Sequence, residues 1–335
     1  MNRTIQFGSA IALAGLVMGM AIVPANAGPA PVNYEPGKLT ADKYASVGKK
    51  AIPFNRDGKI FMQKNYKSMG IYEFKVEYNQ SDVHDDAQVN NDGWFKDMTA
   101  EMYKMVEAMF TEMGFTVKDK DAFSSDSSFA PIRELANGKY VISSDRYRGP
   151  GSNFKDGKPS GGSNTTYTFS FLKQTVPGLY FFDSRTLQLG MGWQNTKGNM
   201  DLMREVERIQ SKFYTLGKEA AAKQDLDFIV SVFITAGLNS DKNGTPETGM
   251  EIHFTERPAP PDPSAKLKVT IGSNPYTMAS GLWYIKKGDN RIGGSGSDKK
   301  QINGEKLKTS MLDMFKVQCN TYAATYNMFK EKSKK

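Results

Sequence analysis

Apolar side chains recur at every second position between residues 69 and 78, the first regular polar–apolar alternation after the N-terminal region. On an extended backbone this spacing places two sets of side chains on opposite faces of a sheet: Tyr72, Phe74, Val76 and Tyr78 on one face, and Ile71, Glu73, Lys75 and Glu77 on the other. The segment is therefore predicted to be a strand with one buried face.

Three longer stretches, residues 94–113, 199–223 and 304–330, repeat apolar side chains at the three- and four-residue intervals of a helix face. The repeating residues are Phe95, Met98, Met102, Met105, Val106, Met109 and Met113; Leu202, Val206, Ile209, Phe213 and Leu216; and Leu312, Phe315, Cys319, Tyr322, Tyr326 and Phe329. Gly114 follows the first stretch at the place of a C-cap glycine. Stripes rich in methionine and aromatic residues are more typical of a helix packed on a core than of a cofactor site.

Residues 227–235 form a nearly continuous apolar run, which predicts a central strand buried on both faces. Together with the strand–helix–strand order of residues 69–119, this run favours an α/β (α+β) fold. We expect a mixed β-sheet packed by three long helices, with a β-rich insertion.

Composition along the chain suggests where this fold is divided. Residues 28–55 are rich in proline, glycine and alanine, and are predicted to be an extended N-terminal segment. The α/β domain would then comprise residues 56–143 and residues 199–335, the latter ending in the C-terminal helix. Between them, residues 144–198 are predicted to be the β-rich insertion, with a flexible Gly/Ser loop.

The first residues resemble an export signal. Arg3 precedes an apolar segment at residues 11–23, and Ala25 and Ala27 have the small-x-small spacing that signal peptidase requires. The apolar segment is short for a bilayer span. Residues 1–27 are therefore predicted to be a signal peptide cleaved after Ala27, and the mature protein is expected in the periplasm or the secreted fraction.

The net charge limits which classes of partner are expected. The formal net charge is +8, and Lys330, Lys332, Lys334 and Lys335 contribute to it near the C-terminus. Lipid head groups, surface glycans or acidic proteins would fit this charge in an exported protein, although a solubilising surplus is the interpretation we favour. Nucleic acid is not an expected partner.

The single cysteine, Cys319, excludes an intramolecular disulfide, and its place in a helix stripe indicates a buried structural thiol.

One loop offers candidate metal ligands. Asp82, His84, Asp85 and Asp86 bring three carboxylates and an imidazole within five residues, a set that suits calcium or zinc. Adjacent loop residues rarely converge on one ion without a second segment, so we favour a solvated acidic loop ahead of the helix and predict no metal site. His253 has no companion nearby in sequence and is interpreted as an ordinary surface or cross-strand histidine.

The sequence contains no recognisable catalytic residue and no cofactor site. The chain has no G-x-S-x-G nucleophile elbow, and the glycine-rich residues 293–297 lack the ending of a phosphate loop. Two acids distant in sequence can still meet in a cleft. We therefore predict a protein that is not an enzyme, and leave open a hydrolase with a dispersed carboxylate site.

Several segments carry a family resemblance. The strand at residues 71–78, the helix at 94–113 and the Gly-Phe-Thr-Val-Lys-Asp sequence at 114–119 resemble the opening of the curli-secretion and TolB-N-terminal-like α/β domains of the bacterial envelope. The helix running into residues 227–233, and residues 282–292 before the last helix, are similar to that family's central strand and closing hairpin. The resemblance implies a non-catalytic part of a periplasmic or outer-membrane assembly.

The leading hypothesis is therefore a structural or assembly component of a cell-envelope machine of the secretion, flagellar or surface-fibre type. It would act through protein partners, as a possible homo-oligomer, with membrane contact that is peripheral at most. The alternative from another class is a periplasmic small-molecule or glycan-binding protein that stacks its ligand on Trp94, Trp193 or Trp283.

Overall fold

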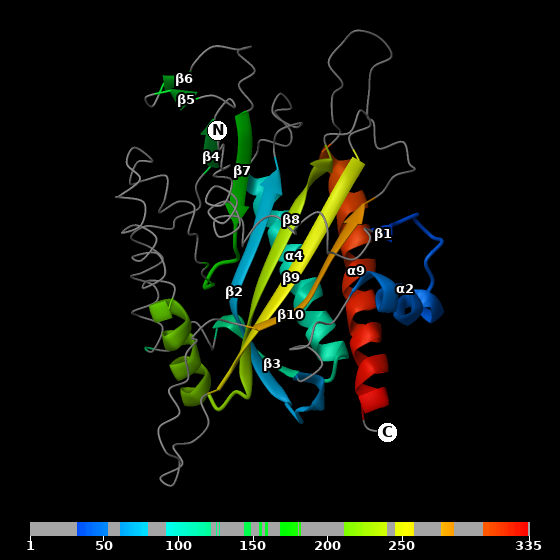
Figure 1. Cartoon of the computed structure of the whole chain (residues 1–335), viewed down its shortest axis with the longest axis vertical. Coiled ribbons are helices and arrows are strands. Elements are labelled where there is room, and N and C mark those ends of the chain that lie inside the picture. Colours follow the sequence, from blue (N-terminus) through cyan, green and yellow to red (C-terminus); the bar gives the residue numbers. More distant parts are fainter. Residues whose placement is uncertain are drawn as a thin grey trace, which may run out of the picture.

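The computed structural model has an α/β fold and confirms the mixed sheet with helices packed on it. The residues that the structure describes are 32–52, 61–79, 92–121, 125, 127, 144–148, 154–155, 158–159, 168–179, 181, 211–239, 245–257, 276–284 and 304–333. Within them, one large sheet runs through the molecule and helices lie against it (Figure 1).

The large sheet has eight strands, in the order β1-β10-β9-β8-β2-β7-β4, with β3 beside β2. Their bounds are β1 (Val32–Asn33), β2 (Ser68–Asn79), β3 (Thr116–Lys118), β4 (Ser144–Arg148), β7 (Thr168–Gln174), β8 (Phe228–Asn239), β9 (Thr245–Glu256) and β10 (Tyr276–Tyr284). Two further short strands, β5 (Phe154–Lys155) and β6 (Lys158–Pro159), pair with each other. β8 lies between β9 and β2, so the predicted central strand is confirmed.

The sheet contains both parallel and antiparallel strand pairs. β2 pairs with β8 in parallel, whereas β8 pairs with β9, and β9 with β10, in antiparallel fashion. On its other side β2 pairs with β3 at its beginning and with β7 at its end. β4 pairs with β7, so strands from the predicted β-rich insertion extend the main sheet.

The main core lies on one face of the sheet, under α4 (Asp92–Glu112) and α9 (Gly304–Ser333). Its buried side chains include Ile71, Phe74 and Val76 from β2, Val230, Val232 and Ile234 from β8, Met250 and Ile252 from β9, Met98, Met102 and Val106 from α4, and Phe315, Cys319 and Tyr322 from α9. These two helix stripes are therefore core, as predicted. Neither α9 nor any other described helix combines the length and the apolar character that crossing a membrane requires.

Aromatic rings fill one end of this core. The centroid of Phe228, at the start of β8, lies 4.8 Å from that of Phe61, 5.4 Å from that of Tyr66 and 5.2 Å from that of Phe115. The Phe61 and Phe115 contacts are edge-on, the geometry that aromatic pairs favour. Phe228 is thus the residue through which three separate segments meet.

A bulge at Tyr72 changes the alternation along β2. Ile71 aligns with Val230 and Glu73 with Ser231, which leaves Tyr72 without a register partner on β8. The predicted faces of Ile71 and Tyr72 are therefore wrong: Ile71 joins the main core, and Tyr72 lies on the opposite face with Glu73. The cause is the extra residue of the bulge, which shifts the alternation by one position.

A helix at residues 211–223, yellow-green in Figure 1, packs on that opposite face. Tyr72 Oη donates a hydrogen bond to the carbonyl oxygen of Phe213 at 2.6 Å. Gly217 approaches the sheet so closely that a Cβ there would lie 2.8 Å from Cδ1 of Ile229 and 2.9 Å from the Tyr72 ring. Glycine therefore sets the helix-to-sheet distance. The N-terminal part of the helix predicted for this region lies outside the described residues.

Two helices end in a left-handed residue. Gly114 has φ +89° and follows α4, and the N–H of Phe115 reaches back to the carbonyl of Phe110 at 3.1 Å, so the predicted C-cap glycine is confirmed. Asp225, with φ 53°, ends the helix at 211–223 in the same way. In both caps a backbone N–H donates a hydrogen bond to a carbonyl oxygen that has no partner within the helix.

The N-terminal segment differs from its prediction. Instead of extended chain throughout residues 28–55, the structure has η1 (Ala41–Lys43) followed by α2 (Tyr44–Ala51). The prolines that favoured an extended chain are confined to the ends of the segment, and none lies between Pro36 and Pro53. A helix is therefore free to form there.

Cys319 lies on α9, on the side that packs into the main core. Its residue is 2 % exposed, and burial raises the pKa of the thiol well above its ordinary value. The prediction of a buried structural thiol is confirmed, because a protonated, enclosed thiol is not a reactive one.

Candidate functional site

The acidic loop with Asp82, His84, Asp85 and Asp86 lies outside the described residues, so its solvated character stays a prediction. In the part of the chain that the structure describes, no group of three or more His, Cys, Asp or Glu side chains is placed to hold a metal ion. The charged residues that the structure does bring together lie on the sheet itself.

Charged side chains line the sheet face opposite the main core. Glu73, Lys75 and Glu77 project from β2 toward this face and are 0 %, 7 % and 6 % exposed. The prediction that β2 has one buried face is therefore wrong, since both of its faces are enclosed. The physical reason at one end is the helix at 211–223, which packs over Tyr72 and beside Glu73.

Neighbouring strands continue this row of charges. In register, Lys75 lies beside Phe233 of β8, and Phe233 lies beside Glu251 of β9. Lys75 Nζ lies 5.0 Å from the centroid of the Phe233 ring, and that centroid is 5.5 Å from the centroid of the His253 ring. His253 Nε2 lies 3.0 Å from Glu251 Oε1. An ammonium group and an acid–imidazole pair thus flank one aromatic ring, and we call Glu73, Lys75, Glu77, Glu251 and His253 the charged row.

The electrostatics of Glu251 follow from these neighbours. Burial raises the pKa of Glu251, but the hydrogen bond to His253, the charge of His253 and the charge of Lys75 outweigh it. The pKa is therefore held below its ordinary value of 4.5. Glu251 is an anion at neutral pH.

Two tyrosines, Tyr72 and Tyr214, lie next to Glu73 at the other end of the charged row. Tyr214 Oη donates a hydrogen bond to Glu73 Oε2 at 3.2 Å. Burial, followed by the charge of Glu73, raises the pKa of Tyr72 well above its ordinary value. Tyr72 therefore remains a protonated phenol and keeps its hydrogen bond to the helix at 211–223.

The sequence identified only part of the charged row. It placed Glu73, Lys75 and Glu77 on one face, but as the polar side of the strand, and it interpreted His253 as an ordinary surface or cross-strand histidine. One signal was available: a central strand buried on both faces implies that its neighbours are also covered on both faces. The arrangement places carboxylates, an ammonium group and an imidazole side by side on one covered face of the sheet.

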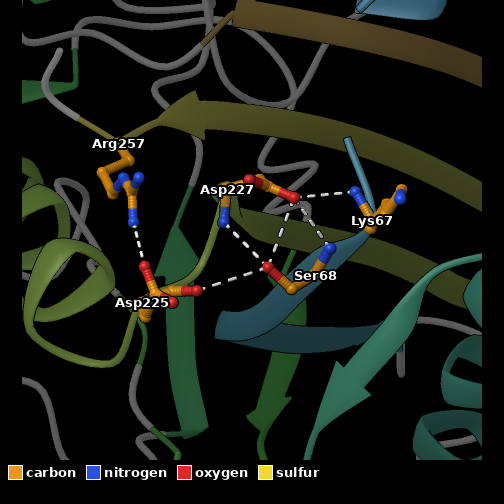
Figure 2. Close-up of polar contacts among 5 residues, drawn as sticks. All are labelled: Lys67, Ser68, Asp225, Asp227 and Arg257. Atoms are coloured by element: carbon orange, nitrogen blue, oxygen red, sulfur yellow. Dashed lines mark hydrogen bonds and ion pairs between the residues drawn. The ribbon is translucent and has the colours of Figure 1, made fainter. Parts of the chain in front are cut away.

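A second polar cluster joins β2, β8 and β9 (Figure 2). Asp227 Oδ2 accepts hydrogen bonds from the backbone N–H groups of Lys67 at 2.7 Å and Ser68 at 2.9 Å. The N–H of Asp227 lies 3.1 Å from the Ser68 carbonyl oxygen, and the N–H of Arg257 donates to the Asp227 carbonyl at 3.0 Å. The Arg257 guanidinium pairs with Asp225. This cluster ties three strands together, and its role is structural.

Replacing Asp227 with alanine is expected to lower the free energy of unfolding by about 1–3 kcal/mol at pH 7, since two backbone N–H groups lose their acceptor. Partial burial raises the pKa of Asp227, but the hydrogen bonds from Lys67 and Ser68 outweigh it and hold the pKa below 3.8. A lowered folded-state pKa gives stability that is complete above the unfolded value and is lost as the pH falls through the folded value.

The deficit of the Asp227→Ala variant should therefore shrink as the pH falls below 3.8. Urea unfolding at pH 7 and at pH 3 measures this. Asp97→Ala is the control, because its side chain is 73 % exposed with Lys308 at 3.8 Å, and surface pairs contribute about 0–1 kcal/mol. Unchanged stability of Asp227→Ala at pH 7 would contradict the structural role.

The outer side of β10 is paired only in part. β9 runs along one side of β10, whereas β1 pairs on the other side with Trp283 and Tyr284 alone. Within the described ranges, no strand pairs with the outer side of residues 276–282. Their sequence, Tyr-Thr-Met-Ala-Ser-Gly-Leu, has neither the charged residues nor the proline that commonly protect a sheet edge.

The tryptophans proposed as ligand platforms are only partly described. Trp94 is 7 % exposed, and its ring packs edge-on against Phe95 with centroids 4.9 Å apart. Its faces are therefore taken up by the core rather than open to a ligand. Trp193 and the side chain of Trp283 lie outside the described part of the molecule.

None of the protein-family models, curated proteins or solved structures compared with this chain matches it. The resemblance to curli-secretion and TolB-N-terminal-like domains therefore stays a prediction, as does export.

Proposed function

We propose that this chain is an exported, non-catalytic protein that serves as a structural or assembly component of a bacterial cell-envelope machine. Its work would be done through protein–protein contacts. The observation that supports this proposal is the outer side of β10, where residues 276–282 have no strand partner among the described residues. Backbone N–H and C=O groups in that position are a template for a strand from another chain.

The geometry of β10 suits such an addition. Each backbone hydrogen bond gained there would contribute about 0.5–1.5 kcal/mol, so a short strand can bind with useful affinity. The run is interrupted at Met278, where the register with β9 shifts between Thr277 and Ala279. A partner strand is therefore expected to pair with residues 279–282, on the regular part of the edge.

Photo-crosslinking tests the proposal directly. A photoreactive amino acid replaces Ser280 on β10, or Lys104 on α4 as the matched control, whose side chain is 67 % exposed. Each variant is expressed in the native host and irradiated in intact cells. Discrete adducts with envelope proteins are expected from position 280 and not from position 104.

Circular dichroism of both purified variants checks that the fold is retained. A folded variant that gives no adduct at position 280, or the same adducts at both positions, would contradict binding through this edge.

A further inference from the structure

Residues 32–52, which we call the N-terminal arm, lie along the outside of the fold. In Figure 1 the arm, in blue, stands beside β10 and α9. Its strand β1 pairs in parallel with β10, Val32 beside Trp283 and Asn33 beside Tyr284. Its helix α2 packs against α9, the last helix of the chain. The strand and the helix of the arm thus pack mainly on β10 and α9, from the C-terminal part of the chain.

A glycine fits the arm to this site. A Cβ on Gly48 of α2 would overlap Oγ1 of Thr325 and lie 3.0 Å from Cγ2 of Thr321. Both threonines are fully buried. α2 can therefore approach α9 this closely only because residue 48 is glycine, and we call this close-contact point on α9 the slot.

The arm also has a small apolar cluster of its own. Tyr34 is buried there against Met314 of α9, and the partly buried side chains around them are Val32, Leu39, Val47 and Val317. Only Ile52, at the end of the arm, is a fully buried member of the main core. The arm can therefore leave its slot while most of the main core stays packed.

The arm belongs to the beginning of the mature chain if residues 1–27 are removed. A segment next to a free end can move from its own site to the same site on another molecule without threading the chain. We propose that the surface formed by α9 at Thr321 and Thr325 and by β10 at Trp283 and Tyr284 binds the N-terminal arm of a second copy of this chain. The inference rests on the proposed assembly role and names the partner.

Engineered cysteines can report which arm occupies which site. In a Cys319→Ala background, one copy carries Val32→Cys and a second copy, with a longer tag, carries Trp283→Cys. Neighbouring strands are about 4.8 Å apart, within the Cα separation of about 4.4–6.8 Å that a disulfide spans. After mixing and mild oxidation, a covalent heterodimer is expected on a non-reducing gel.

Two controls make each result decisive. A single chain that carries both Val32→Cys and Trp283→Cys tests whether the arm lies beside β10 at all. An internal disulfide shows that it binds its own chain, and a disulfide-linked dimer shows that it binds another. Gly48→Leu in the Val32→Cys copy should reduce the heterodimer at least tenfold, because leucine cannot enter the slot.

An internal disulfide in the double variant without any heterodimer from the mixed copies would overturn arm exchange. No disulfide of either kind in the double variant would overturn it as well, since the arm would not be on β10. Adducts from position 280 with other envelope proteins, in the absence of the heterodimer, would leave the proposed function standing while this inference fails.

Discussion

Replacing Phe228 with alanine is expected to lower the free energy of unfolding by about 3–5 kcal/mol, the range for deleting a fully buried aromatic side chain. Phe228 is 0 % exposed and is in ring contact with Phe61, Tyr66 and Phe115. Phe61 and Tyr66 come from one segment and Phe115 from another, and both segments are distant from Phe228 in sequence. The surrounding core is closely packed and can relax only in part, so the cavity that alanine would leave stays largely open.

Urea denaturation followed by circular dichroism measures the loss. Phe233→Ala is the matched control, because Phe233 lies on the same strand but faces the charged row and is only partly buried. Its loss should be smaller, about 1–2 kcal/mol, in proportion to the apolar area removed from water. Equal losses in the two variants would contradict the placement of Phe228 at the centre of the aromatic contacts.

Replacing Lys75 with methionine is expected to cost about 3 kcal/mol at pH 7, although the two side chains have similar length. Lys75 is 7 % exposed and lies between Glu73 and Glu77 on β2, with Glu251 beyond Phe233. Removing this ammonium group would leave the buried carboxylates of Glu73 and Glu77 with less counter-charge, which is strongly destabilising.

The cost of Lys75→Met should depend on pH in a defined direction. Lys75 helps to hold the pKa of Glu251 below 4.5, and that stabilisation is present above 4.5 and lost as the pH falls through the folded-state value. The difference between wild type and variant should thus be largest at pH 7 and shrink below pH 4.5. Unfolding curves at pH 7 and pH 4 test this.

Lys104→Met serves as the control, because Lys104 is exposed and pairs with Glu101 on the surface of α4. Its effect should be about 0.3–0.5 kcal/mol. A penalty for Lys75→Met that does not change with pH would show that its cause is lost packing rather than charge.

Features set by local periodicity were predictable from the sequence. The stripes of α4 and α9, the left-handed Gly114 and the central β8 each follow from residues within one segment. Helical spacing and a C-cap glycine act over a few residues, so no knowledge of the rest of the chain is required.

Features that depend on distant contacts were not predictable. The bulge at Tyr72 follows from the pairing of β2 with β8, and the burial of Lys75 depends on what covers the sheet. The Glu251–His253 pair becomes part of the charged row only because β9 lies next to β8. Likewise, the slot for Gly48 is made by α9, far along the chain.

The parallel pairing of β2 with β8 has a consequence for how the chain is made. Ser68 and Asp227, which hydrogen-bond at the start of the two strands, are 159 positions apart. A ribosome adding about 5–20 residues per second would complete β2 roughly 8–30 s before its partner strand exists. During that delay the apolar side chains of β2 can pack against α4, the next described element along the chain. This early strand–helix unit would protect the nascent chain from aggregation.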